Sequence, residues 1–472
     1  MIMLQRHAAT DEARDMAQRA CAAATRRGTP VLLAVTREIE PRKALTLYAR
    51  AVLAGHDATY WEQPSLANVT VAAGVAFRVG THGGQRFVDA ASAWRDLVEG
   101  AVASRPNALV AFAGFAFAAP ARRAPHWQTF GDGALVVPAL TYRSMDTRAE
   151  ITLATTVQPE QAADGVAFAL APLLQGDSGA PVDLRPSSRV VKESCSLDRW
   201  REAVTSIEDA IARGALDKAV LARELRLHAD RAFDATGAIA RLREGYPDCT
   251  VFAFACEGAC FMGATPERLV RVQGRKVYAT CLAGTALRGR DERGDKEAAA
   301  ALLADEKERR EHEVVVRAIT GALTPLCGDL DVPAQPSIMT MPNVLHLHTR
   351  IEGTLAARTG VLDLVERLHP TPAVGGMPLD AALSLIRRHE EFDRGWYAGP
   401  VGWIDANGDG EFAVALRSAL VRGTEARLFA GCGIVAGSDP QREYDESEMK
   451  LKPMLAALRQ RTASANGQRD EC

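Results

Sequence analysis

Two short stripes of charged residues, far apart in the chain, combine residue types that can hold a metal ion. Glu443, Glu446 and Lys450 recur at i, i+3 and i+7 in a helical segment, so they share one face of the expected helix. Glu308 and Glu311 show the same carboxylate spacing at the start of an apolar helical segment. A single stripe of this kind is usually a solvated, salt-bridged face. Two acidic stripes on partly buried helices favour instead one site with oxygen ligands, of the kind that Mg²⁺ prefers.

A lysine within an apolar strand is the second feature that could carry chemistry. Only eight of the 56 Lys and Arg residues are lysines, and Lys218 lies in LDKAVLARELRL, where Lys218, Val220 and Ala222 share one face. An arginine keeps its proton at workable pH, whereas a lysine can act as a base. On these residues alone, Lys218 could also be a surface lysine whose ammonium reaches solvent.

The glycine-rich segment GCGIVA at 431–436 follows an expected strand and precedes an expected helix. This arrangement fits a dinucleotide-binding fingerprint, but only about one helix remains after it, without a second strand for a ribose-binding acid. Gly431 and Gly433 still allow backbone amides to approach an anion closely. DANGDGEF at 405–412 resembles a calcium loop, yet Leu416 occupies the position of the bidentate glutamate, which favours a hairpin turn.

Composition excludes several classes of protein. The 472 residues are 47% hydrophobic and carry a formal net charge of −3, which argues against binding nucleic acid or anionic membranes through bulk electrostatics. The longest apolar run, 108–120, is too short to span a bilayer and predicts a buried strand. No signal-peptide stretch opens the sequence, and the nine cysteines lack a CxxC pair, which fits reduced thiols. We therefore expect a cytoplasmic protein that binds neither nucleic acid nor a membrane.

Hydrophobic periodicity predicts a strand-rich first half and a second half in which strands and helices alternate. The Gly-, Pro- and Ser-rich segment 173–195 indicates a linker between the halves. In the second half we expect helices over 196–214, 295–323 and 361–369, antiparallel strands over 250–289, and a long hairpin over 395–421. The expected division is 1–195, 196–460 and a C-terminal tail, 461–472.

A series of segments occurs in the order seen in one enzyme family: DKAVLAREL, GATPERL, LAGTALRG, KERREHEVVV, LHLHTRIEG, LHPTPAVGGMP, GWYAGPVGWID, VALRSALV and GCGIVAGSDPQREYDESEMKLK. Over 197–455 the chain resembles the chorismate-utilising enzymes, and among them most closely the isochorismate synthases. In the first half, YWEQP and AFAGFAF look like the family's N-terminal strands. The resemblance implies an α/β (α+β) fold like that of anthranilate synthase component I: one compact unit of large antiparallel sheets flanked by helices, with the site between them.

The resemblance also implies a reaction. Isochorismate forms from chorismate when water adds at C2 and the C4 hydroxyl leaves, so the site needs a base on one side and an acid on the other. Lys218 matches the family's base. Glu267, in ATPERL, matches its general acid and must be protonated to act. We therefore expect a desolvated site that raises the pKa of Glu267.

Further roles follow from the same resemblance. Glu311 and Glu446 match the ligands of Mg²⁺. Glu308 and Glu443 match nearby positions that contact the ion through water or support its direct ligands. His346 is preferred to His348 because the family's histidine precedes the leucine at this point. The positions that match substrate contacts are Gly284, Thr285, His346, Ala373, Tyr397, Arg417, Gly431, Gly433 and Lys450.

The loop TPAVGGMP distinguishes branches of the family. Aminating relatives generally carry Thr and a GAPK ending here, whereas this chain has Ala373 followed by GMPLD. We therefore expect an isochorismate synthase that acts on chorismate as a monomer without an amidotransferase subunit. The alternatives are a salicylate synthase, which would also eliminate pyruvate, an anthranilate-synthase-like lyase, and a non-catalytic chorismate-binding relative. The sequence leaves open whether the product enters menaquinone, siderophore or salicylate synthesis.

Overall fold

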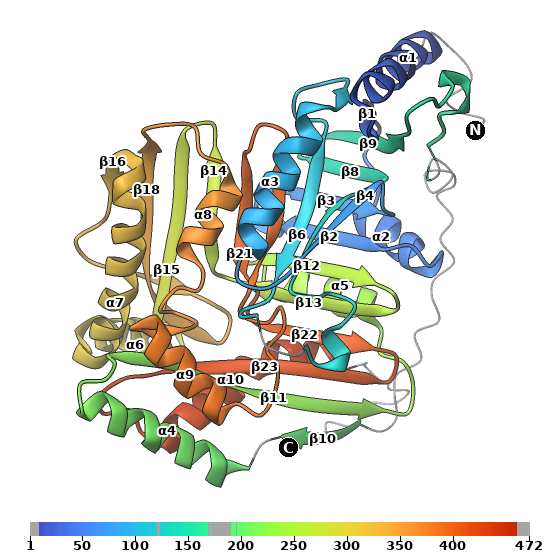
Figure 1. Cartoon of the computed structure of the whole chain (residues 1–472). Helices are drawn as coiled ribbons and strands as arrows, with labels where there is room; N and C mark the ends of the chain where they lie inside the picture. The colour runs from blue at the N-terminus through green and yellow to red at the C-terminus, as the bar shows by residue number, and fades with distance from the viewer. Residues whose placement is uncertain (1–8, 120–122, 169, 171–189, 195, 460–472) are drawn as a thin grey trace.

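Two large β-sheets pack against each other and form the body of the molecule (Figure 1). The computed structural model describes residues 9–119, 123–168, 170, 190–194 and 196–459. Strands from before and after residue 195 contribute to both sheets, and almost all pairs are antiparallel. The segments on either side of this position are therefore interleaved in space.

The first sheet has thirteen strands and carries the expected base on its strand β11. In spatial order its strands are β10 (Val190–Ser194), β11 (Lys218–Ala229), β23 (Glu425–Ile434), β22 (Ser418–Arg422), β13 (Ala259–Thr265), β12 (Thr250–Cys256), β2 (Ala58–Gln63), β3 (Asn68–Ala73), β8 (Leu140–Met145), β9 (Arg148–Val157), β1 (Val31–Ile39) and β5 (Val102–Ala103), and β19 (Gly376–Met377) pairs with β11.

The second sheet has ten strands. Their order is β16 (Cys327–Asp331), β18 (Val344–Leu355), β15 (Lys276–Leu287), β14 (Arg268–Gln273), β21 (Gly410–Val414), β20 (Pro400–Asp405), β6 (Val110–Phe115), β7 (Gly133–Val137) and β4 (Phe77–Thr81), and β17 (Ser337–Thr340) pairs with β18.

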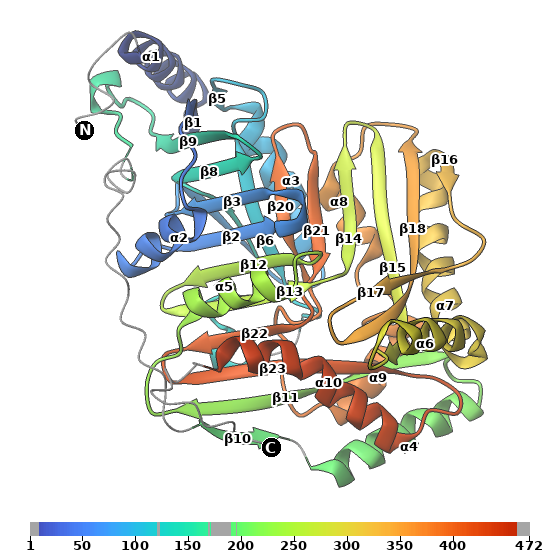
Figure 2. The ribbon, with the colours of Figure 1, turned by 180° about the vertical axis from the view of Figure 1, so that it is seen from behind.

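Helices cover the outer faces of the sheets. The described helices are α1 (Ala9–Arg27), α2 (Ala44–Leu53), α3 (Arg86–Glu99), α4 (Leu197–Ala212), α5 (Ala235–Gly245), α6 (Glu292–Ala304), α7 (Glu306–Leu323), α8 (Val361–Leu368), α9 (Leu379–His389) and α10 (Pro440–Leu458). Seen from behind, α10 lies along β23, and α7 runs beside β15 and β18 (Figure 2). None of the described helices is long and apolar enough to cross a membrane.

The largest hydrophobic core lies between the sheets. Phe112 on β6 and Phe412 on β21 face Phe252, Phe261 and Phe429 of the other sheet, and all five rings are buried. Burying an aromatic side chain of this size stabilises a fold by about 1.5–3 kcal/mol. The core therefore holds the two sheets together as one unit.

The chain crosses between the sheets several times, and two of these crossings are joined to each other. Glu267 lies between β13 and β14, and Arg417 lies between β21 and β22. The crossings are joined because Thr265 Oγ1 donates to the Val414 carbonyl at 2.6 Å and the Val414 amide donates to the Glu267 carbonyl at 3.0 Å. The expected hairpin over 395–421 is thus only β20–β21, since β22 belongs to the other sheet.

Two other expectations from the sequence change in the structure. The helical pattern over 295–323 forms two helices, because Asp305 ends α6 and caps α7 by accepting a hydrogen bond from the Glu308 amide at 3.0 Å. Residues 190–194 of the expected linker form β10, while 173–189 and 195, like the tail 461–472, lie outside the described residues.

Candidate active site

A pocket of about 760 Å³ lies where the two sheet crossings meet β11, β23 and α10. Twelve of the fifteen residues expected in the site line it: Glu267, Gly284, Thr285, Glu311, His346, Ala373, Tyr397, Arg417, Gly431, Gly433, Glu446 and Lys450. The other three contact this lining. Lys218 pairs with Glu311, the Thr285 amide donates to Glu308, and a carboxylate oxygen of Glu443 lies within 4.8 Å of one of Glu446. His348 is not among the lining residues, and its ring contacts Ser337 instead.

Lys218 is fully buried at the start of β11. Its Nζ lies 2.7 Å from Glu311 Oε1 on α7. Burial alone would raise the pKa of Glu311, but the neighbouring Lys218 ammonium lowers it below its usual range. This pair needs Gly433 opposite it on β23, because a Cβ at that position would lie 2.2 Å from Glu311 Oε1.

Glu267 is a buried carboxyl group that forms no ion pair among the described residues. Burial raises its pKa to about 8, against the opposing effect of the Lys218 and Lys450 charges. At neutral pH this group therefore keeps its proton, as expected for a general acid. The crossing between β13 and β14 places it in the pocket wall.

Four carboxylates from α7 and α10 converge beside Lys218. Burial and the Glu311 charge raise the pKa of Glu308 to about 7, and burial and Glu446 raise the pKa of Glu443. These shifts show that the oxygens repel one another in a half-desolvated cluster, a condition that a bound divalent cation would relieve. The donor set therefore fits Mg²⁺.

Two nearby groups were not expected from the sequence. The Lys307 ammonium lies 3.0 Å from Glu443 Oε1 and 3.4 Å from Glu308 Oε1. Cys432 Sγ lies within 4.8 Å of the Glu443 and Glu446 oxygens. Because burial raises the pKa of the Cys432 thiol well above its usual range, this thiol stays protonated and is a poor ligand for a hard cation.

Part of the pocket wall is cationic, because Arg417 and Lys450 line it. Arg417 is half-buried, and its Nη1 atom has no hydrogen-bond partner among the described residues. Its Nη2 donates to His346 Nε2 at 3.3 Å. Since an arginine cannot accept, the proton of His346 is on Nδ1, which lies 3.3 Å from the Gly284 carbonyl. Burial lowers the pKa of His346 to about 3, so the ring is neutral and Arg417 remains available to an anion.

Backbone amides lie beside this cationic wall. Lys450 Nζ donates to the Gly431 carbonyl at 2.9 Å and lies 2.5 Å from Glu446 Oε1. The Gly431 carbonyl therefore points away from β11. In an antiparallel strand the amide of the same residue points the same way, as does that of Gly433 two residues further on. Both amides thus face the open edge of β23, where the pocket lies.

Arg394 is a lining residue that the sequence motifs did not single out. It forms an ion pair with Glu390 and donates to two backbone carbonyls. A buried arginine four residues after a glutamate is a weak signal in a sequence, because the same spacing is common on exposed helices.

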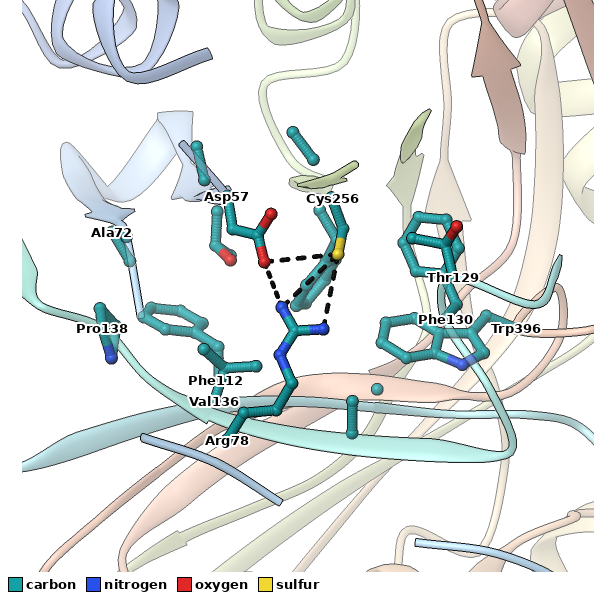
Figure 3. Close-up of a pocket in the computed structure, with 17 residues that line it drawn as sticks. Asp57, Ala72, Arg78, Phe112, Thr129, Phe130, Val136, Pro138, Cys256 and Trp396 are labelled. Carbon is teal, nitrogen blue, oxygen red and sulfur yellow. Dashed lines mark hydrogen bonds and ion pairs between the residues drawn. The ribbon is translucent and has the colours of Figure 1, made fainter. Parts of the chain in front are cut away.

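A second pocket, of about 500 Å³, opens between the two sheets away from the carboxylates (Figure 3). Its aromatic lining includes Phe112, Phe130 and Trp396, and its charged lining residues are Arg78 and Asp57. The Arg78 guanidinium contacts Asp57 and lies 3.5 Å from Cys256 Sγ, so the two charges pair with each other. This pocket has no carboxylate cluster, and the site residues expected from the sequence line the first pocket instead.

The pocket thus combines a carboxylate cluster, a buried protonated carboxyl group and a cationic wall, a set of groups suited to an enzyme that acts on a small anionic substrate. The chain belongs to the family of chorismate-binding enzymes, whose model matches residues 17–459. The family and the fold expected from the sequence are thereby confirmed.

Several similar proteins are isochorismate synthases. The chain is 38% identical to the salicylate biosynthesis isochorismate synthase of Pseudomonas aeruginosa, over 91% of this chain and 90% of that protein. It is 39% identical to the isochorismate synthase MenF of Bacillus subtilis, over 74% of each chain. The solved structure of MenF, the menaquinone-specific isochorismate synthase from Escherichia coli, superimposes with a TM-score of 0.76 at 28% identity, over 94% of this chain and 100% of that one.

Proposed function

We propose that this chain is a magnesium-dependent isochorismate synthase, an isomerase that converts chorismate into isochorismate. The observation that carries the proposal is the chemistry of one pocket, in which a buried lysine lies beside a carboxylate cluster and a protonated Glu267 lies in the wall. The similarity to isochorismate synthases supports the same activity.

In the proposed mechanism, Lys218 in its neutral form takes a proton from the water that attacks C2 of the substrate ring. Both ring double bonds shift, the C4–oxygen bond breaks, and Glu267 gives its proton to the departing hydroxyl, which leaves as water. One water enters and one leaves, so the overall change is an isomerisation. The pKa of about 8 at Glu267 keeps this acid loaded at neutral pH.

Chorismate carries two carboxylates, and the pocket offers two kinds of partner. In this proposal one carboxylate binds to Arg417, Tyr397, Lys450 and the amides of Gly431 and Gly433. The unpartnered Arg417 Nη1 in the pocket wall supports this role. When bound, Mg²⁺ would neutralise the carboxylate on the ring. Glu311 and Glu446 would hold the ion, with Glu308 and Glu443 beside them.

Ala373 lies in the wall and offers no hydroxyl to hold another nucleophile or to assist pyruvate elimination. We therefore propose that isochorismate is the final product and that the chain works in the cytoplasm as a monomer without an amidotransferase subunit. Incubation of the purified chain with chorismate, Mg²⁺ and ammonium salts should yield isochorismate on chromatography, with at most traces of salicylate or anthranilate. Salicylate as the major product, without added lyase, would move the chain to the salicylate-synthase branch.

The metal is tested on the same protein. Turnover should stop in EDTA and return with excess Mg²⁺, and Glu311→Gln and Glu446→Gln should each weaken Mg²⁺ binding in calorimetric titration, because an amide lacks the carboxylate's charge. Lys296→Gln, on exposed α6, is the matched surface control. Full activity after metal analysis has shown complete removal of Mg²⁺ would contradict the assignment.

A further inference from the structure

Arg394 lines the pocket, yet its guanidinium is not free to bind substrate. Its Nε donates to Glu390 Oε2 at 2.8 Å and its Nη2 donates to Glu390 Oε1 at 2.5 Å. Both side chains are about 96% buried, and the guanidinium lies 4.2 Å from the centre of the Phe117 ring. Two further hydrogen bonds go to backbone carbonyls, so four of its five N–H groups are committed within the protein.

The backbone contacts join two segments of the site. Arg394 Nη2 donates to the Val220 carbonyl on β11 at 2.7 Å, and Nη1 donates to the Val374 carbonyl at 2.9 Å. Glu390 Oε1 accepts from the Ala222 amide at 2.8 Å. One ion pair therefore contacts the strand that begins with Lys218 and the loop that contains Ala373.

The position of these contacts on β11 explains why an ion pair is needed there. On this edge of β11, β19 pairs with Lys218 and Ala219, and β10 pairs from Leu225 onward. Between these two short strands the edge has no partner strand among the described residues. In this gap Arg394 binds the Val220 carbonyl and Glu390 binds the Ala222 amide, and buried backbone groups need such partners.

We propose that Arg394 and Glu390 are positioning residues that fix Lys218 relative to the loop around Ala373. The inference rests on the proposed function, because it assigns Lys218 to the base and Ala373 to the substrate wall. The arginine fork is essential to it, since a lysine at position 394 keeps the charge but cannot contact Glu390 and both carbonyls at once.

Arg394→Lys tests the proposal against Arg243→Lys. Arg243 forms the same fork with the buried Glu62, at 2.9 and 2.7 Å, but outside the pocket. With chorismate and Mg²⁺, Arg394→Lys should lower kcat by about 10²-fold with a much smaller change in KM, because a displacement near 1 Å costs that much in rate. Arg243→Lys should keep kcat within about twofold of the wild type. Equal losses of kcat in the two variants would overturn the proposal and leave the proposed function standing.

Amide hydrogen exchange supplies a measurement that does not depend on turnover. In Arg394→Lys, exchange should accelerate in peptides covering 218–222 and 371–376 and remain at the wild-type rate in α7 and α10. In Arg243→Lys these two peptides should keep wild-type rates. Unchanged exchange in both peptides of Arg394→Lys, or acceleration spread evenly over the chain, would contradict a positioning role. If the wild type failed to convert chorismate, the proposed function would be wrong. The exchange rates in the two peptides would still test whether Arg394 and Glu390 position Lys218 and the loop.

Discussion

At the scale of single residues, the site separates groups that are paired from groups that are kept free. Lys218 lies against Glu311, and Lys450 lies against Glu446, at 2.7 and 2.5 Å. Glu267 has no such partner among the described residues, and burial holds its proton in place. The same residue types thus take different protonation states because their neighbours differ.

The assignment of Lys218 as the base predicts the effect of two substitutions. Lys218→Ala should lower kcat by about 10²–10⁴-fold, the usual cost of losing an acid–base group. Lys218→Arg should be nearly as inactive, because arginine keeps the charge but cannot accept a proton. Steady-state kinetics with chorismate measures both, and Lys452→Arg, on the exposed face of α10, is the control. Near-normal kcat in Lys218→Arg would make Lys218 an electrostatic anchor.

At the scale of elements, α7, β11 and β23 converge on one point. Val220 pairs with Gly433 across the two strands, and Glu311 reaches them from α7. A Cβ at Gly433 would lie 2.2 Å from Glu311 Oε1 and 2.8 Å from Lys218 Cε. The helix can approach the strands this closely only because the strand has no side chain there.

Gly433→Ala should therefore separate Lys218 from Glu311 and lower kcat/KM by about 10²-fold, as expected for a misplaced reacting group. Gly321→Ala on α7 is the matched control, because no atom lies within 4 Å of a Cβ there. It should leave kcat/KM unchanged and stabilise the helix by about 0.5–1 kcal/mol, measured by urea unfolding. Wild-type kinetics in Gly433→Ala would show that the helix can shift without loss.

At the scale of the whole molecule, the site weakens the fold that carries it. Glu267 is buried where the two sheets exchange strands, and its pKa rises from 4.5 to about 8 on folding. Between these values the native state binds more protons than the unfolded state, so stability falls as pH rises through this window.

Glu267→Gln should remove this pH dependence and much of the activity together. One unit of pKa shift corresponds to about 1.36 kcal/mol. As the pH rises from about 5 to 8.5, the free energy of unfolding of the variant should therefore increase by up to a few kcal/mol relative to that of the wild type. Urea unfolding of the metal-free proteins at both pH values measures the difference. If the difference in free energy of unfolding between variant and wild type is the same at both pH values, Glu267 is not the titrating group.

The sequence by itself determined the periodicities, the shared face of Glu308 and Glu311, and the ordered segments that identify the family. These are local properties, because helix and strand geometry fix which neighbours along the chain share a face. Secondary-structure patterns therefore placed α8, α10 and β11 with small errors at their ends, whereas α6 and α7 were expected as one helix. The roles of Lys218 and Glu267 remain predictions from the resemblance.

Only the tertiary structure decided which sheet each strand joins and what meets at the crossings. β21 and β22 are close in sequence, yet they belong to different sheets, and the crossing between them places Arg417 in the same pocket as Glu267. The sequence motifs did not indicate Arg394 or Lys307. Arg394 binds a backbone carbonyl and Lys307 binds a carboxylate, and both partners are distant in sequence. Strand pairing and burial join residues that are hundreds of positions apart, and no local pattern encodes that proximity.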